Sequence, residues 1–187
     1  MSFSHAQNVD NLVAYYPLNG TADDISSYNN HGIVKGTKAT QDRFGIEESA
    51  LYFDGINDFI TVPHNELLNF DANNDCYTLC FWVKSELSKY QNELGEACII
   101  TKSNDYMYSA YPFNIYGGSG KLTFDIRDDG AQSNPNTSIL DYGLMSEWNH
   151  IALIVSSKNI SIYINGRLRE IKPVSIEENT KCANDIL

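Results

Sequence analysis

Short stretches that are apolar throughout, or in which apolar and polar residues alternate, recur along almost the whole chain of 187 residues. Gly, Asn, Asp and Pro separate these stretches, and helical periodicity is hard to find. Alternation with a period of two is typical of β-strands, whereas a helix repeats its apolar positions every three or four residues. The pattern therefore predicts an all-β protein.

The N-terminal part contains predicted strands at Leu12 to Leu18, Gly32 to Val34, Ala50 to Phe53 and Phe59 to Val62. The last two flank the segment Asp54-Gly55-Ile56-Asn57-Asp58. Because its glycine can take a positive φ, we predict that these two strands form a hairpin.

The stretch from Tyr77 to Lys84 is apolar on both faces, with Cys80 and Trp82 together on one of them. A strand that is apolar on both faces is typical of the middle of a sandwich. We therefore predict a central strand here, and we expect the segment from Ala97 to Lys102 to be its antiparallel neighbour.

Three hairpins are predicted in the C-terminal half. A Gly-rich turn joins Phe113 to Tyr116 with Leu122 to Arg127, and a turn at Ser157-Lys158 joins Trp148 to Ser156 with Asn159 to Asn165. Asn165-Gly166 then leads into Arg167 to Ile171, while the polar segment from Asp128 to Ser138 is predicted to be a loop. Short strands at this spacing predict two packed antiparallel sheets in one domain, residues 12–187, after a tail of residues 1–11.

Composition narrows the possible partners. Apolar residues make up 42% of the chain, which is enough for a substantial core, and the net charge of -11 disfavours nucleic acid. No run approaches the length of about 18 apolar residues that a membrane-spanning helix needs, so we expect no membrane insertion. The N-terminus lacks the basic region and long apolar segment of a signal peptide.

The order of several short phrases resembles the laminin-G-like and pentraxin-like members of the concanavalin A-like lectin/glucanase jelly-roll family. The phrases are Leu12-Val13-Ala14-Tyr15-Tyr16-Pro17-Leu18-Asn19-Gly20, Asp24-Ile25-Ser26-Ser27 leading to His31-Gly32, Arg43-Phe44-Gly45, Ala50-Leu51-Tyr52-Phe53-Asp54-Gly55, Asn57-Asp58-Phe59-Ile60, Tyr77-Thr78-Leu79-Cys80-Phe81-Trp82-Val83, Trp148-Asn149-His150-Ile151-Ala152 and Ile162-Tyr163-Ile164-Asn165-Gly166. The resemblance implies a jelly roll that serves as a non-catalytic carbohydrate-binding or adhesion module of a larger secreted or cell-surface protein.

Two alternatives stay open. Similar domains also serve as structural or protein-interaction spacers without a sugar ligand, and related folds hydrolyse glycans. The expected partner of a module of this family is a glycan or an extracellular protein.

Two departures from the family pattern stand out. Ser27 occupies a position where similar sequences usually have Gly, and the chain stops at Asp185-Ile186-Leu187, where the first of the usual closing strands would begin. We therefore expect a domain that lacks its C-terminal strands and has an exposed sheet edge.

The resemblance also implies structural calcium in the loops, with Asp24, Asp54 and Asp58 as its candidate ligands. Calcium takes six to eight oxygen ligands from carboxylates, carbonyls and water. The alternative is that these carboxylates cap their own turns. A pentraxin-like calcium site would instead use Asn104 and Asp105.

For a sugar ligand, we predict stacking on Tyr106, Tyr108 and Tyr111, because a tyrosine ring offers a flat face and a hydroxyl group. The alternative is that these side chains pack on the edge of the sandwich. Trp82 and Trp148 are predicted to lie in the core.

No catalytic pattern is found. Glycanases of related fold carry carboxylates on alternate residues of one strand, whereas Glu47-Glu48 and Glu177-Glu178 are adjacent and would point to opposite faces. The four cysteines lack the spacing of a zinc site, and both disulfides and free thiols remain possible for them. We therefore predict that the protein is not an enzyme.

Overall fold

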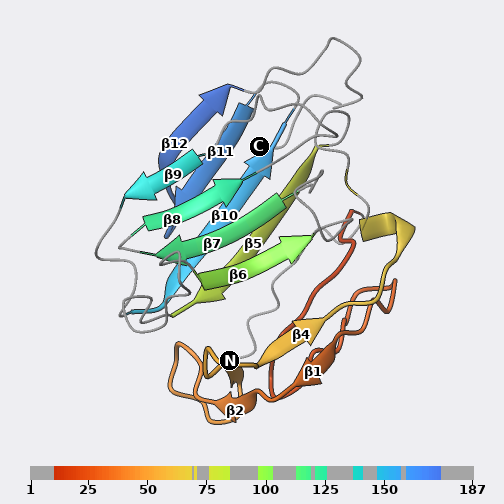
Figure 1. Ribbon diagram of the computed structural model, residues 1–187. Helices are drawn as coiled ribbons and strands as arrows, with labels where there is room; N and C mark the ends of the chain where they lie inside the picture. Colours follow the sequence, from red (N-terminus) through yellow and green to blue (C-terminus); the bar gives the residue numbers. More distant parts are fainter. Residues whose placement is uncertain are drawn as a thin grey trace, which may run out of the picture. The chain divides into compact units, whose positions relative to one another are not determined.

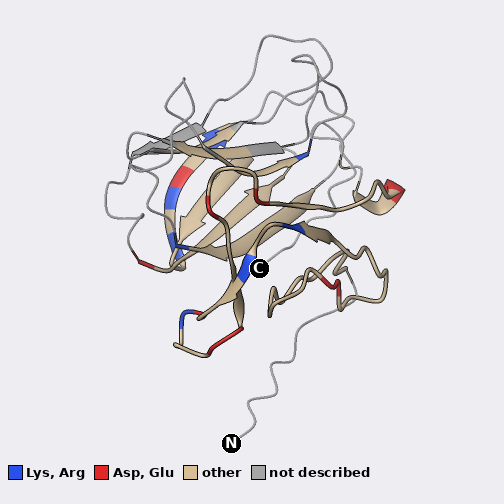
Figure 2. Cartoon of the chain, turned by 60° about the horizontal axis from the view of Figure 1, so that its bottom comes forward, with Lys and Arg blue, Asp and Glu red and all other residues tan. Residues whose placement is uncertain are grey.

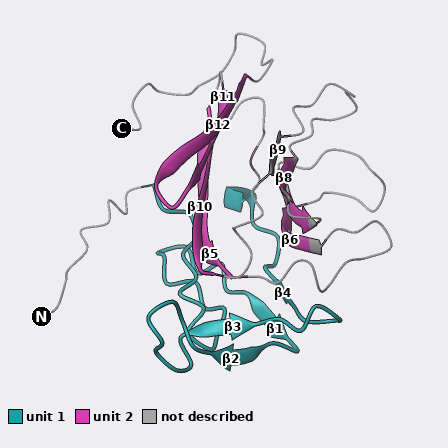
Figure 3. Cartoon of the chain, turned by 90° about the vertical axis from the view of Figure 1, so that its left-hand side faces the viewer, with its two compact units in different colours: residues 1–69 teal, residues 70–187 magenta. Residues whose placement is uncertain are grey.

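The computed structural model describes residues 11–68, 70, 76–84, 97–102, 113–118, 121–125, 137–140, 147–156 and 159–173. The chain divides into two compact units, residues 1–69 and residues 70–187 (Figure 3). Apart from one short 3-10 helix, all regular elements in the described ranges are strands. The all-β prediction is confirmed.

Unit 2 is a sandwich of two antiparallel four-stranded sheets (Figures 1 and 3). We call the first the β10 sheet, with the order β12-β11-β10-β5, and the second the β7 sheet, with the order β6-β7-β8-β9. The strands are β5 (Tyr77–Val83), β6 (Ala97–Lys102), β7 (Phe113–Gly118), β8 (Lys121–Asp125), β9 (Thr137–Leu140), β10 (Asn149–Val155), β11 (Asn159–Ile164) and β12 (Arg167–Pro173). Two facing antiparallel sheets are the arrangement that the sequence predicts.

The core of unit 2 lies between these sheets. Alternate residues of β10 and β11 point inward, so that Leu153 and Ile162 are fully buried. They belong to one hydrophobic cluster with Ile115, Leu122 and Phe124 of the β7 sheet. Full burial of one such side chain stabilises a fold by about 1.5–3 kcal/mol, and this cluster therefore holds the two sheets together.

Unit 1 contains two short antiparallel pairs. β1 (Ile33–Lys35) pairs with β4 (Phe59–Thr61), and β2 (Lys38–Thr40) pairs with β3 (Ala50–Tyr52). The 3-10 helix η1 (Glu66–Leu68) follows. Irregular backbone forms much of the rest of this unit, so side-chain hydrogen bonds have to satisfy many of its peptide groups.

Two predictions in unit 1 are wrong. The segment from Leu12 to Leu18 is not a strand: the N–H of Tyr15 donates to a side chain, Asp24, and the carbonyl of Val13 accepts from the side chain of Asn30. The strands on either side of the turn at residues 54–58 do not form a hairpin, because each pairs instead with a strand that precedes both of them. One of these partners, β2, was not predicted.

In unit 2, the hairpins β7–β8, β10–β11 and β11–β12 are confirmed. The role predicted for β5 is wrong, since β5 pairs with β10 rather than β6 and ends its sheet in the described part of the chain. Trp82 of β5 is consequently 44% exposed and is not a core residue. β9 lies partly within the predicted loop, Asp128 to Ser138.

The described cysteines include both of the predicted possibilities. Cys76 is disulfide-bonded, whereas Cys80 and Cys98 are not part of a disulfide. Cys182 lies outside the described residues.

Candidate functional site

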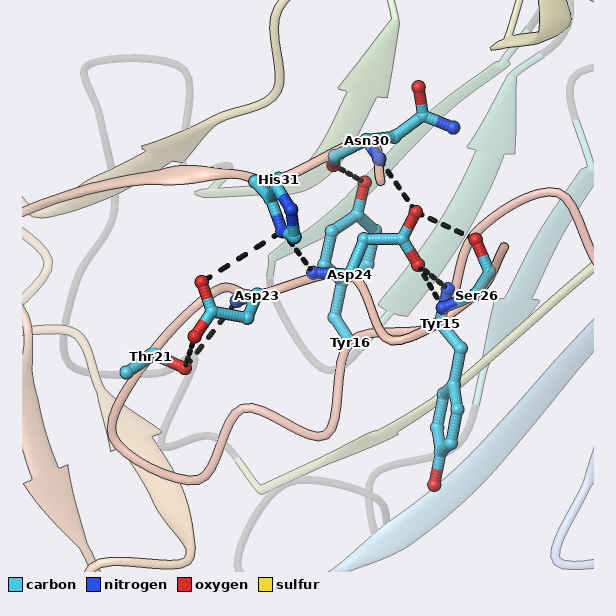
Figure 4. A network of polar contacts seen from close by, with 8 residues as sticks. All are labelled: Tyr15, Tyr16, Thr21, Asp23, Asp24, Ser26, Asn30 and His31. Carbon is cyan, nitrogen blue, oxygen red and sulfur yellow. Dashed lines mark hydrogen bonds and ion pairs between the residues drawn. The ribbon is translucent and has the colours of Figure 1, made fainter. Parts of the chain in front are cut away.

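Asp24 is the centre of a buried polar network in unit 1 (Figure 4). Its side chain is almost completely buried, at 2% exposure, and its two carboxylate oxygens accept four hydrogen bonds. The donors are the backbone N–H groups of Tyr15 (2.8 Å), Ser26 (2.9 Å) and Asn30 (2.8 Å), and the hydroxyl group of Ser26 (2.8 Å). One carboxylate therefore ties together three points of the irregular backbone.

Neighbouring side chains extend this network. The hydroxyl of Tyr16 donates to the carbonyl of Asn30 (2.6 Å), and the amide of Asn65 donates to the Asn30 side-chain oxygen (2.6 Å). The backbone N–H of Asp24 donates to Nδ1 of His31 at 3.2 Å. Side chains thus satisfy backbone N–H and C=O groups that neighbouring strands satisfy in a β-sheet.

The charge of Asp24 is stabilised by this geometry. Burial acts to raise the pKa of Asp24, but the hydrogen bonds from Tyr15, Ser26 and Asn30 outweigh burial, and the pKa is lowered. Burial and, to a smaller extent, the negative charge of Asp24 raise the pKa of Tyr16 to about 12. At neutral pH, Asp24 is therefore ionised while Tyr16 keeps its proton.

Asp54 and Asp58 lie together in the turn between β3 and β4. The backbone N–H of Asp54 donates to the Asp58 carboxylate (2.9 Å), and the Asp54 carboxylate accepts from the N–H of Ile56 (2.8 Å). Gly36 has a φ of +82°, and a Cβ atom there would collide with the Asp58 carboxylate. These contacts are the turn-capping alternative to calcium binding.

The predicted metal ligands do not form one cluster. Among the described residues, no group of three or more His, Cys, Asp or Glu side chains is arranged to hold a metal ion. Calcium at Asp24, Asp54 and Asp58 stays a prediction. The predicted sugar-binding residues Tyr106, Tyr108 and Tyr111, and the pair Asn104-Asp105, lie outside the described residues.

The outer face of the β10 sheet is the second feature of interest. Strand register and alternating burial place the following residues on the face that points away from the core: Thr78, Cys80, Trp82, His150, Ala152, Ile154, Ser161, Tyr163, Leu168 and Ile171. We call these residues the outer face. Trp82, Leu168 and Ile171 are 44%, 47% and 51% exposed. A sheet with one solvated face usually carries polar residues there, so this apolar face is unusual.

Trp82 and His150 are direct neighbours on this face, since they are paired across β5 and β10. Their ring centroids lie 5.1 Å apart with an interplanar angle of 53°. The backbone of His150 is held in turn by Asn165, whose N–H donates to the His150 carbonyl (2.8 Å) and whose side-chain oxygen accepts from the His150 N–H (2.9 Å). Hydrogen bonds to Asn165 therefore hold the backbone that carries the His150 ring.

The sequence contains a signal for this face, but the same signal also predicts a central strand. Residues of both faces of β5 are apolar, and the central strand of a sandwich shows the same pattern. Only the pairing of β5 with β10 at the end of the sheet distinguishes the two cases.

A family model described as the concanavalin A-like lectin/glucanases superfamily, of the laminin-G type, matches residues 53–186. No curated protein matches the chain significantly. No helix in the described part of the chain is long and apolar enough to cross a membrane.

Several solved structures share the fold. The binding domain of botulinum neurotoxin DC, solved in complex with rat synaptotagmin II, has a TM-score of 0.63 and 18% identity and covers 90% of this chain. A structure of botulinum neurotoxin type C, whose cell entry is described as dependent upon interaction with two ganglioside molecules, has a TM-score of 0.60 and 16% identity over 89% of the chain.

An S-layer domain-containing protein from Clostridium thermocellum has a TM-score of 0.50 and 19% identity, and it covers 85% of this chain and 71% of its own. The present chain spans only 40% and 39% of the two toxin chains. At these identities, the likeness establishes the fold alone.

Proposed function

Because the chain belongs to the concanavalin A-like lectin/glucanases superfamily, we propose that it is a non-catalytic carbohydrate-binding or adhesion module of a larger secreted or cell-surface protein. The solved neighbours support a binding role, since they include toxin binding domains in complex with synaptotagmin II or with a sialylated ligand. The disulfide at Cys76 supports an oxidising, extracytoplasmic location, because disulfides persist in such compartments.

Among the described residues, the outer face supports the proposal. Fold alone does not determine function, and the ligand has to be argued from a site. This face presents Trp82 to solvent, on the side of the sheet that faces away from the hydrophobic core cluster. A partly exposed aromatic ring is a group that can stack on the apolar face of a sugar.

A spacer or protein-interaction role is the second candidate. It is favoured by Leu168 and Ile171, which are exposed aliphatic side chains on the same face. Neither candidate depends on calcium, which stays a prediction for Asp24, Asp54 and Asp58.

A glycan array tests the proposal. We expect the purified chain to bind at least one glycan, and we expect the Tyr108→Ala or Tyr111→Ala variant to bind more weakly. Absence of binding at millimolar sugar would favour the spacer role. Hydrolysis of a glycan that a single carboxylate substitution abolishes would overturn the non-catalytic assignment.

A further inference from the structure

The outer face lacks charged side chains at its paired positions. None of the outer-face residues is Lys, Arg, Asp or Glu, and Lys84, two residues beyond Trp82, is the first charged residue at that end. The whole chain, in contrast, carries 24 acidic and 13 basic residues. β5, β10 and β11 contain no Lys, Arg, Asp or Glu, whereas β12 contains Arg167, Arg169, Glu170 and Lys172. Figure 2 marks the charged residues along the chain. The paired outer-face positions of β5, β10 and β11 therefore offer no charge to a ligand, and the nearest charged residues flank them at Lys84 and on β12.

The outer face is also pre-organised. The Trp82 ring packs against the His150 ring at a tilt of 53°, and two hydrogen bonds, one to the Asn165 side-chain oxygen and one from the Asn165 N–H, fix the backbone of His150. A third hydrogen bond, from the Asn165 side-chain amide to the Asn149 side-chain oxygen (2.9 Å), fixes the orientation of Asn165. A ligand that stacks on Trp82 therefore pays little entropy to order the ring.

The area of the outer face favours a short oligosaccharide over a second copy of the chain as its partner. Four strands about 4.8 Å apart and three cross-strand rows about 6.8 Å apart make a surface of roughly 20 Å by 20 Å. Two copies stacked face to face would bury roughly 800 Å², which is below the 1,200 Å² or so of a stable protein interface. The face is too small to be a stable dimer interface by itself, but a short oligosaccharide fits on it.

From these observations we infer that the outer face, centred on Trp82 and His150, is a glycan-binding surface that is separate from the predicted tyrosine loop. It stacks the Trp82 ring on the apolar face of a neutral pyranose, and His150 contributes a ring nitrogen for a hydroxyl group. This inference rests on the proposed function, because it names the ligand class and the place of binding.

The ligand class follows from the charges. Stacking on an aromatic ring needs no counter-charge, so binding should depend little on ionic strength. Acidic glycans, such as sialylated ones, should bind less well, because a chain with a net charge of -11 repels them.

Intrinsic fluorescence of Trp82 tests the surface directly. The chain has two tryptophans, so the Trp148→Phe variant leaves Trp82 as the only tryptophan. It is titrated with neutral hexasaccharides of glucose, xylose, mannose and galactose, and with sialyllactose. We expect a saturable change in fluorescence with at least one neutral hexasaccharide, and a weaker or absent change with sialyllactose.

Variants give the energetic test by isothermal titration calorimetry with the same hexasaccharide. Trp82→Ala should weaken binding about tenfold or more, whereas Trp82→Tyr, which keeps a stacking ring, should stay within about threefold of wild type. Phe44→Ala is the matched control, because Phe44 is an exposed aromatic residue of unit 1 (71% exposed) and should have no effect. Circular dichroism checks that each variant is folded.

The failures are distinguishable. If wild type binds a glycan but Trp82→Ala binds equally well and Tyr108→Ala does not, the inference is wrong and the proposed function stands. If no glycan binds, both are wrong. A dimer in analytical ultracentrifugation that Trp82→Ala abolishes would assign the face to a second copy instead. If Trp82→Ala does not fold, a titration of the Trp148→Phe variant without any fluorescence change overturns the inference.

Discussion

Replacement of Asp24 by asparagine should destabilise unit 1 strongly although it barely changes the shape of the side chain. Each carboxylate oxygen of Asp24 accepts two hydrogen bonds, and Asn30 donates to the same oxygen as the hydroxyl of Ser26. An asparagine amide has to place an NH₂ group where one of these oxygens was. At least one backbone N–H then faces a donor rather than an acceptor.

The magnitude follows from the contacts. A hydrogen bond to a charged group contributes about 1.5–3 kcal/mol, and a buried N–H left without an acceptor costs about 1–3 kcal/mol. We expect Asp24→Asn to cost roughly 3 kcal/mol of local stability. At about 1.4 kcal/mol per factor of ten, this is a loss of more than a hundredfold in the protection of the amides that the network holds.

Hydrogen exchange measured by mass spectrometry is the appropriate assay, because it reports the two units separately. Peptides from residues 11–35 should lose protection in Asp24→Asn, whereas peptides from β10 and β11 should not. Asp23→Asn is the matched control, since the neighbouring Asp23 side chain is 66% exposed.

The pH dependence gives an independent check. The pKa of Asp24 is lowered in the folded state, so its contribution is fully present above the pKa of an unfolded aspartate, about 3.9, and is lost as the pH falls through the folded pKa. Wild-type protection should therefore decline below about pH 4, and that of Asp24→Asn should not follow it. Equal protection in Asp24→Asn and Asp23→Asn at pH 7 would refute the reasoning.

Three further outcomes are expected. Ile162→Ala removes a fully buried side chain and should cost roughly 3–4 kcal/mol in urea unfolding, whereas a cost below 1 kcal/mol would show that the core tolerates the cavity. The pKa of Tyr16 is raised to about 12, so the contribution of its protonated hydroxyl to stability is fully present below about pH 10 and is lost as the pH rises toward 12. The melting temperature, followed by circular dichroism, should therefore fall less steeply with pH in Tyr16→Phe than in the wild type over that range. EDTA should leave the melting temperature unchanged if Asp24, Asp54 and Asp58 cap their own turns, and a fall of several degrees that calcium reverses would instead establish structural calcium.

The elements that the sequence predicted correctly are those whose partners lie nearby in the chain. β10 and β11 alternate with a period of two and are separated by only three residues in the sequence, and β11 continues into β12 through Asn165-Gly166, where both residues take a positive φ. Local pattern and turn chemistry together specify such a hairpin.

The errors arise where a contact that the local pattern does not specify decides the structure. The segment from Leu12 to Leu18 has the composition of a strand, but side chains from the loop that follows, chiefly Asp24 and Asn30, take up its peptide groups. β5 was placed next to β6 because they are consecutive, whereas its partner β10 comes much later. The apolar and polar pattern of the strand itself predicts neither the Asp24 and Asn30 contacts nor the β5–β10 pairing.

The same limit applies to the candidate site. Trp82 was assigned to the core because apolar residues on both faces of a strand have two explanations, a central position or an exposed binding face. The sequence of β5 fits a central strand and an exposed binding face equally well. Only the place of β5 in the sheet separates them.

The two faces of the β10 sheet should therefore respond differently to substitution. Inner residues such as Ile162 and Leu153 pack in the core, and shortening them removes contacts that hold the two sheets together. Trp82 keeps 44% of its surface exposed and contacts His150 on the outer face, so shortening it removes much less buried area. If the outer face only supported the fold, Trp82→Ala would lower stability and leave binding unchanged. A binding surface requires the opposite: affinity falls, while the free energy of unfolding changes far less than it does in Ile162→Ala.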